Sequence, residues 1–171
     1  MSKFITLDLD YWTMTQKFNS AHTDYLETII KKSKSTNVVS LHHHVVSKKI
    51  IPTDTTEVVN IDFHNDIIDD QPDNTLNEGT WGNFLPKSVQ KFTWIYPNHN
   101  MCITRSAGIC IGSDGWEDPD ITHVNYKKIH GCMRYTPECE YNKFAICLSK
   151  KWAHYDINPY IEYLRKKKLV K

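Results

Sequence analysis

The chain of 171 residues is long enough to bury a sizeable core, and 40% apolar with 24% charged residues is typical of a soluble globular protein. Its 21 lysines and arginines exceed its 20 aspartates and glutamates by one, which argues against a nucleic-acid binder with a basic stripe. No stretch approaches the roughly 20 apolar residues of a membrane span, and no signal-peptide core is evident. We expect one cytoplasmic domain, residues 1–171, with reduced cysteines; its oligomeric state stays open.

Short apolar runs alternate with helical patterns, which favours an α/β fold. The first half is predicted to contain a strand over Phe4–Leu9, a helix capped by Ser20 with Tyr25, Leu26, Ile29 and Ile30 on one face, and strands over Val38–Leu41 and Glu57–Ile61. The second half is predicted to begin with a loop from Asp69 to Gly79 and a short helical element in GTWGNFL. Its strands are predicted over Phe92–Tyr96, within Cys102–Ile111, near Thr122–Tyr126 and near Phe144–Leu148. The last element is a helix capped by Asn158.

Three predicted strands run directly into residues that commonly bind metals. These are Asp8 and Asp10 in LDLD, His42 and His43 in LHHH, and Asp62, His64 and Asp66 in IDFHND. Residues two positions apart in an extended chain point to the same face, and strand ends of an open α/β sheet converge on one crevice. So many ionisable groups in one crevice need balancing cations. The mixed oxygen and nitrogen donors suit manganese, and two such ions can share a bridging hydroxide.

Each motif also has a plainer interpretation. The aspartates of LDLD could form a turn or cap a helix, and three consecutive histidines could lie on the surface by accident. The alternating acid, histidine and acid of IDFHND have few structural explanations directly after a buried strand. The conjunction of the three motifs therefore favours a metal site.

The motif IDFHND resembles the Asp-Ala-His-x-Asp signature of the arginase and ureohydrolase superfamily, with Phe63 in place of the small residue. LDLD resembles the second, Asp-x-Asp signature of that superfamily, and the region of His42 resembles its lone ligand histidine. The layout VVSLHHHVV, VNIDFHNDI, EGTWGNFL and FTWIYPN is similar to small arginase-like proteins that include peptide arginases. The resemblance implies a compact three-layer α/β sandwich with a mostly parallel central sheet.

The resemblance also implies a ligand set for two manganese ions per chain. Asp62 and Asp8 would bridge the ions, His64 and Asp10 would bind one of them, and Asp66 would bind the other with His42 or its rival His43. One departure is the order of the motifs, because the superfamily places Asp-x-Asp after Asp-x-His-x-Asp, whereas here it comes first. A permuted sheet could assemble the same site.

By resemblance, the substrate is a ribosomally made peptide whose arginine side chains become ornithine with release of urea. A carboxylate must hold the guanidinium, and Glu78 is our candidate, although it could be a solvated loop acid. Asp62, His64 and Glu78 thus form the predicted catalytic set. Trp81 could stack on the guanidinium or belong to the core, and Asn65 could orient substrate or cap the turn. The unranked proton-shuttle candidates are His99, His123, His130 and His154.

Two other hypotheses assume the same metal site but assign it a different function. One is a two-metal hydrolase of amides or phosphoesters, for which a phosphate site should show arginines or lysines near the metals. The internal arginines, Arg105 and Arg134, lie outside the metal motifs. The other is a catalytically inactive metal-binding protein. Neither a nucleic acid nor a membrane is expected as a partner.

Overall fold

The computed structural model describes residues 2–14, 16–64, 66–67, 75–77, 79–96, 124–130 and 143–171. Its strands are β1 (Ser2–Asp8), β2 (Thr36–Val39), β3 (Thr55–Ile61), β4 (Lys91–Tyr96), β5 (Asn125–His130) and β6 (Lys143–Cys147). Its helices are α1 (Asp10–Thr13), α2 (Ser20–Lys32), α3 (His44–Ser47), the 3-10 helix η1 (Trp81–Phe84) and α4 (Asn158–Lys166). None of these helices is long and apolar enough to cross a membrane.

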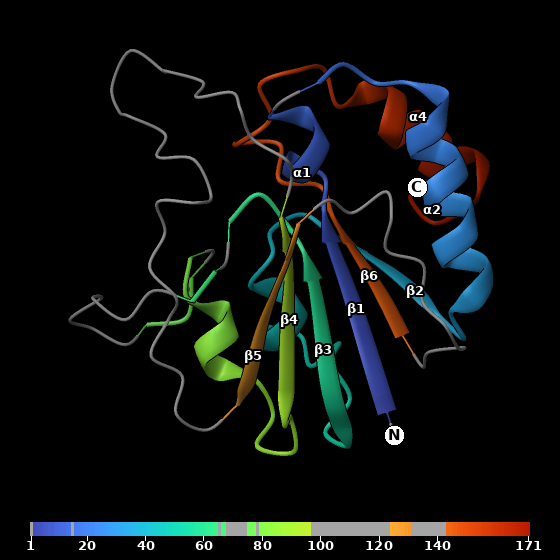
Figure 1. The fold of residues 1–171 in the computed structure, drawn as a ribbon. Helices are drawn as coiled ribbons and strands as arrows, with labels where there is room; N and C mark the ends of the chain where they lie inside the picture. The colour runs from blue at the N-terminus through green and yellow to red at the C-terminus, as the bar shows by residue number, and fades with distance from the viewer. Residues whose placement is uncertain are drawn as a thin grey trace, which may run out of the picture.

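The six strands form one sheet in the order β2-β6-β1-β3-β4-β5, and every neighbouring pair is parallel (Figure 1). The predicted α/β class with a parallel sheet is therefore confirmed. Because the strands run together, their carboxyl ends all lie at one edge of the sheet, next to α1 (Figure 1).

The two faces of the sheet carry separate apolar clusters, which explains why the strands read as continuous apolar runs. Ile5 and Leu7 of β1 pack with residues of α2 and α4 on one face. Phe4 of the same strand packs with Val45 of α3 and Trp81 of η1 on the other. Side chains alternate between faces along a strand, so β1 is buried on both sides.

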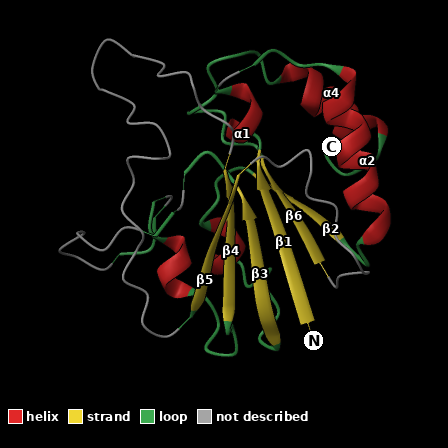
Figure 2. Ribbon diagram, viewed as in Figure 1, coloured by secondary structure: helices red, strands yellow, loops and turns green. Residues whose placement is uncertain are grey.

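The helices α2 and α4 lie side by side against the first face (Figure 2). The hydroxyl of Tyr163 donates to Glu27 Oε2 at 2.9 Å, and Lys167 forms an ion pair with the same carboxylate. Of the predicted apolar face of α2, Tyr25, Leu26 and Ile29 are buried, whereas Ile30 is partly buried.

Several element boundaries differ from the predictions. The helix α2 begins at Ser20 with Asn19 as its cap, because Asn19 has extended dihedrals, φ −145° and ψ 168°. The last helix likewise begins at Asn158, after Ile157. Strand β2 ends at Val39, two residues earlier than expected, and β5 runs further, to His130, because it pairs with β4 up to Tyr96. The predicted strand within Cys102–Ile111 and most of the loop Asp69–Gly79 lie outside the described residues.

Candidate metal centre

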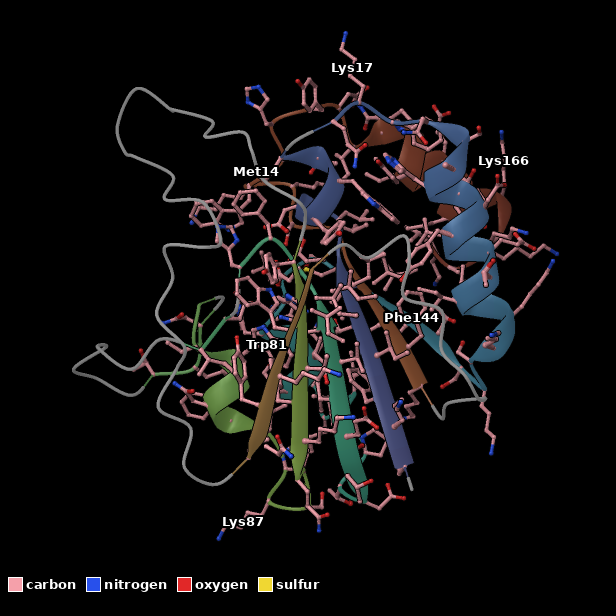
Figure 3. All side chains as sticks on the ribbon, viewed as in Figure 1. Met14, Lys17, Trp81, Lys87, Phe144 and Lys166 are labelled. Carbon is pink, nitrogen blue, oxygen red and sulfur yellow. The ribbon has the colours of Figure 1, made fainter. Side chains whose placement is uncertain are left out.

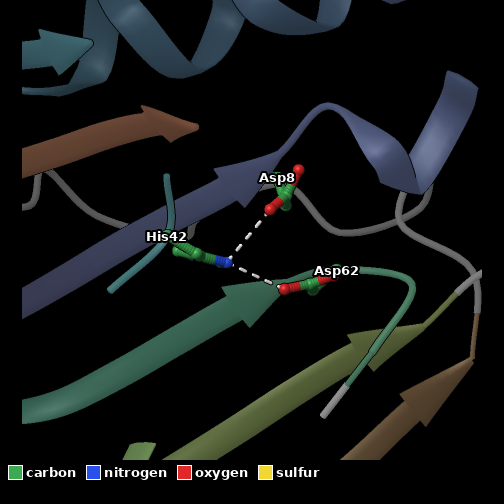
Figure 4. Close-up of side chains that lie close together, drawn as sticks. All are labelled: Asp8, His42 and Asp62. Carbon is green, nitrogen blue, oxygen red and sulfur yellow. Dashed lines mark ion pairs between the residues drawn. The ribbon is translucent and has the colours of Figure 1, made fainter. Parts of the chain in front are cut away.

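Asp8 and Asp62 lie beside each other because of the register between two neighbouring strands. Leu7 of β1 pairs with Ile61 of β3, so the next residue of each chain emerges at the same level of the sheet edge. Figure 4 shows the two carboxylates at the ends of these strands, with His42 pointing between them. The three residues are buried, with exposed fractions of 3%, 1% and 1% in the order Asp8, Asp62, His42.

The imidazole of His42 meets three carboxylates through one nitrogen. Its Nδ1 lies 2.9 Å from Asp62 Oδ2, 3.0 Å from Asp66 Oδ2 and 3.3 Å from Asp8 Oδ2. This nitrogen is buried and has no well-directed hydrogen bond to any of the described residues, although the oxygens are near. A buried polar atom in that state indicates a position where a cation would sit between imidazole and carboxylates.

Neighbouring side chains hold His42 and Asp66 in place. The ring of His42 packs on the indole of Trp81, with centroids 4.6 Å apart, and the indole Nε1–H of Trp81 donates to Asp66 Oδ2 at 2.5 Å. The amide of Gly82 donates to the backbone carbonyl of Asp66 at 3.1 Å. Asp66 itself has a left-handed backbone, φ 58°, and its carboxylate lies 3.0 Å from His42 Nδ1.

A second group of potential ligands is built on Asp10, the first residue of α1. The Nδ1 of His64 lies 3.1 Å from Asp10 Oδ2, and the backbone N–H of His64 donates to Asp62 Oδ1 at 2.9 Å. The other carboxylate oxygen of Asp10 accepts the backbone N–H of Phe63 at 3.4 Å. Whereas Asp10 is buried, the His64 side chain is 31% exposed and marks the side of the site that faces solvent.

The two groups are overlapping triads that share one residue. They are Asp8, His42 and Asp62, and Asp10, Asp62 and His64, with the possible ligand atoms of each triad within 4.8 Å of one another. Each triad could hold a metal ion, and Asp62 could contribute to both. The structure thus brings together all the predicted metal ligands except His43.

The electrostatics of the site suit a bound cation. Burial, and then the charges of Asp66 and Asp8, raise the pKa of Asp62 above its ordinary value. Burial and the charge of Asp62 raise the pKa of Asp10 to about 6. Carboxylates whose pKa rises in this way lack enough positive charge around them.

The pKa values of the two histidines also reflect the excess of negative charge in the site. Burial alone would lower the pKa of His42, but Asp62, Asp66 and Asp8 raise it well above its ordinary value. For His64, burial is likewise outweighed, chiefly by Asp10, so that its pKa rises to about 10. A bound cation would relieve the charge imbalance that these pKa shifts reflect. The set of aspartate oxygens and imidazole nitrogens fits divalent ions such as manganese better than thiolate-preferring metals.

The remaining predicted site residues have these positions. His43 caps α3 and its ring contacts His44, with centroids 4.7 Å apart, so the turn after β2 brings His42 and not His43 to the carboxylates. Trp81 is fully buried and supports Asp66 and His42; its contact with a substrate stays a prediction. Glu78, Asn65, His99, His123 and the side chain of His130 lie outside the described residues, and the amide of His154 donates to Thr13 at 3.1 Å.

Three supporting residues were not singled out from the sequence. The hydroxyl of Thr6 lies 2.7 Å from His42 Nε2, the indole N–H of Trp94 donates to the Asp62 carbonyl at 3.0 Å, and the hydroxyl of Ser149 donates to Asp8 Oδ2. A signal was present for two of them. Thr6 shares a strand face with Asp8, and Ser149 follows the apolar strand β6 as Asp10 follows β1 and Asp62 follows β3.

No protein-family model, curated protein or solved structure matches this chain. Fold and site together define its class: an α/β protein with an all-parallel six-stranded sheet and a buried cluster of aspartates and histidines that could hold metal ions.

Proposed function

We propose that the protein is a manganese-dependent hydrolase of the arginase type. It would cleave the guanidinium group of arginine residues in a ribosomally made peptide, giving ornithine and urea. The observation that carries the proposal is the sharing of Asp62 between two triads of possible ligands, as a pair of adjacent metal ions requires. The resemblance of IDFHND and LDLD to the superfamily signatures supports the choice of bond.

The proposal extends to the fold. A compact three-layer, arginase-like sandwich is supported by apolar clusters on both sides of the sheet, one with α2 and α4 and the other with α3 and η1.

Two manganese ions, when bound, would supply a water molecule activated at neutral pH. The residues of the chain would hold that centre rigid. Asp62 would hold both ions, because the two triads share it, and Asp8 as a second shared ligand rests on the resemblance alone. His42 and Asp66 would hold one ion, and Asp10 and His64 the other. Glu78, three positions before Trp81 in the sequence, would hold the cationic guanidinium.

The accessible side of the site lies at His64, and this suggests where a peptide would approach. The indole of Trp152 lies against His64 with centroids 6.2 Å apart, and it is 36% exposed. A flat aromatic ring beside the site could contact a planar guanidinium or a peptide side chain.

The test combines metal analysis with a search for turnover. Purified protein loaded with Mn²⁺ is analysed for metal content and incubated with an arginine-rich peptide library, and ornithine and urea are measured by mass spectrometry. The proposal expects two ions per chain and arginine conversion that is lost in Asp62→Ala and kept in Asp54→Ala, an exposed aspartate before β3. A single bound ion, or conversion unaffected by Asp62→Ala, contradicts it. Full metal loading without turnover would favour the inactive metal-binding protein.

A second candidate, phosphoester hydrolysis, is favoured by one lysine. The Nζ of Lys151 lies 4.8 Å from the ring centroid of Trp152, which itself contacts His64. A cation at the accessible side suits an anionic substrate and disfavours a guanidinium.

Lys151→Ala separates these two functions because it changes their substrate affinities in opposite directions. For arginine peptides, the Michaelis constant should fall by about 2- to 5-fold in the variant, as expected for one exposed charge. For a phosphate monoester such as p-nitrophenyl phosphate, it should rise by a similar factor. Lys87→Ala serves as the matched control. Lys87 is exposed and lies at the opposite end of the sheet from Met14, which is near the carboxyl ends of the strands (Figure 3).

A further inference from the structure

Ser149 has an unusual backbone conformation directly beside the metal centre. The described non-glycine residues with positive φ are Lys49 (54°), Asp66 (58°), Ser149 (39°) and Lys168 (59°). Lys49 and Lys168 follow the ends of α3 and α4, where a left-handed residue is an ordinary way to end a helix. Asp66 and Ser149 follow no helix. Both lie at the aspartate–histidine cluster, where a strained backbone often serves a function.

The conformation of Ser149 lets its hydroxyl reach Asp8. Ser149 is 2% exposed, and its Oγ donates to Asp8 Oδ2, the oxygen that faces His42. The other oxygen, Asp8 Oδ1, accepts the backbone N–H of Asp10 at 3.0 Å. The carboxylate of Asp8 is therefore held through both of its oxygens, one from its own turn and one from the end of β6.

A buried thiol is the second partner of the Ser149 hydroxyl. Cys147 Sγ lies 3.1 Å from Ser149 Oγ, and Cys147 is fully buried. An ionised carboxylate only accepts hydrogen bonds, so the hydroxyl proton points to Asp8 and the thiol donates to the serine oxygen. The hydroxyl thus has a partner on each side and one orientation.

The turn alone does not call for a serine. A glycine adopts positive φ at no steric cost, whereas a serine is strained there. What the serine adds at this position is the hydrogen bond to Asp8. We infer that Ser149 is a positioning residue of the metal centre, whose hydroxyl presets the Asp8 carboxylate for the ion held with His42 and Asp62. This inference rests on the metal centre of the proposed function and does not depend on the reaction.

Two substitutions separate the hydroxyl from the backbone. Ser149→Ala removes the hydroxyl and keeps the strain, whereas Ser149→Gly removes both. The matched control is Ser88→Ala, which removes a hydroxyl that donates to Thr53 and Thr55 at 2.7 Å, at the amino end of β3.

Metal-free proteins of all 171 residues are titrated with Mn²⁺ by calorimetry and with Co²⁺ by its visible absorption, and their unfolding temperatures are recorded. We expect the dissociation constant of the affected ion to rise by about 10- to 100-fold in both Ser149 variants, the usual effect of removing a group that orients a ligand. The Co²⁺ spectrum should change in both, and Ser88→Ala should match the wild type. Ser149→Gly should unfold at a temperature no lower than Ser149→Ala.

Each outcome distinguishes this inference from the proposed function. Wild-type affinity and an unchanged Co²⁺ spectrum in Ser149→Ala overturn the inference alone. An affinity loss in Ser149→Ala that Ser149→Gly restores also overturns it, because the backbone and not the hydroxyl would then matter. Wild-type protein that binds neither ion overturns both. Metal binding with the expected losses, but without urea release, overturns only the proposed function.

Discussion

The Nε2 of His42 lies 2.7 Å from the hydroxyl of Thr6, a fully buried residue in the middle of β1. Because this hydroxyl engages Nε2, the other ring nitrogen faces the carboxylates of Asp8, Asp62 and Asp66. Histidines that bind metals commonly have their second ring nitrogen fixed by such a partner. One strand thus supplies both a carboxylate, Asp8, and the residue that orients the imidazole beside it.

Replacing Thr6 with valine should weaken metal binding without changing the shape of the core. The variant leaves the buried Nε2 of His42 without its hydrogen-bond partner, so the ring is no longer held by Thr6. We expect the Mn²⁺ dissociation constant to rise by about 10-fold or more, measured by calorimetry. Thr6→Ser keeps the hydroxyl and should stay close to the wild type. A loss in Thr6→Ser as large as that in Thr6→Val would contradict the prediction, because the serine keeps the hydroxyl.

The shared position of Asp62 predicts different metal contents for two isosteric variants. Asp62→Asn removes a carboxylate from both triads, whereas Asp10→Asn removes one from the His64 triad only. We therefore expect Asp62→Asn to lose both ions and Asp10→Asn to keep the ion held by Asp8 and His42. Metal content after gel filtration, by inductively coupled plasma mass spectrometry, measures this. An Asp10→Asn protein empty of metal would show that the triads do not fill independently.

A methyl group at Gly82 should disturb Asp66. A Cβ there would lie 2.5 Å from Ile67 Cγ1 and 3.2 Å from the Asp66 carbonyl, so the segment after His64 would have to move. We expect Gly82→Ala to lower the free energy of unfolding by about 1–3 kcal/mol, the usual cost of overpacking, and to weaken metal binding. Urea unfolding and metal titration check the two effects, with exposed Lys87→Ala as control. A variant with unchanged stability but reduced metal affinity would show that the methyl group displaces Asp66 without destabilising the core.

The buried His22 predicts an acid sensitivity away from the metal centre. Burial lowers the pKa of His22 to about 4, and its ring stacks on Trp12 and bonds to Tyr160. The unfolded state, with a pKa near 6.5, binds the proton more readily. The stability contributed by neutral His22 is therefore complete above pH 6.5 and decreases as the pH falls toward 4.

The slope attributable to His22 is at most about 1.4 kcal/mol per pH unit. His22→Gln cannot titrate and should lack it. Because other groups titrate as well, the difference in unfolding free energy between wild type and variant, measured in urea with a chelator at several pH values, isolates this residue. A difference that stays constant across the range would contradict the prediction.

The sequence was sufficient to predict the parallel α/β sheet and the convergence of its strand ends. Alternation along an extended chain was the wrong reason for grouping Asp8 with Asp10, and Asp62 with His64 and Asp66, because the chain turns at these positions: Asp10 begins α1, and Asp66 has φ 58°. Asp8 and Asp10 consequently belong to different triads. The choice between His42 and His43 required knowledge of tertiary structure, because β2 ends at Val39 and the following turn decides which ring faces the carboxylates.

Two supporting roles depend on contacts that no local pattern encodes. Ser149 stands at the start of the polar segment SKKW, which is typical of a solvated turn, and its bond to Asp8 spans 141 positions. The sequence leaves Trp81 as either a core residue or a substrate contact, and its buried indole N–H donates to the Asp66 carboxylate.

The place of β6 in the sheet sets the order in which the site can be completed during synthesis. Strand β2 pairs with β6 and with no other strand of the described sheet, and β6 separates it from β1. The strands of Asp8 and Asp62 can pair once β3 has left the ribosome, but the strand before His42 gains its neighbour only when Lys143–Cys147 has been made. A nascent chain would thus present its carboxylates well before the imidazole that joins them, and tight capture of a cation would mark the end of folding.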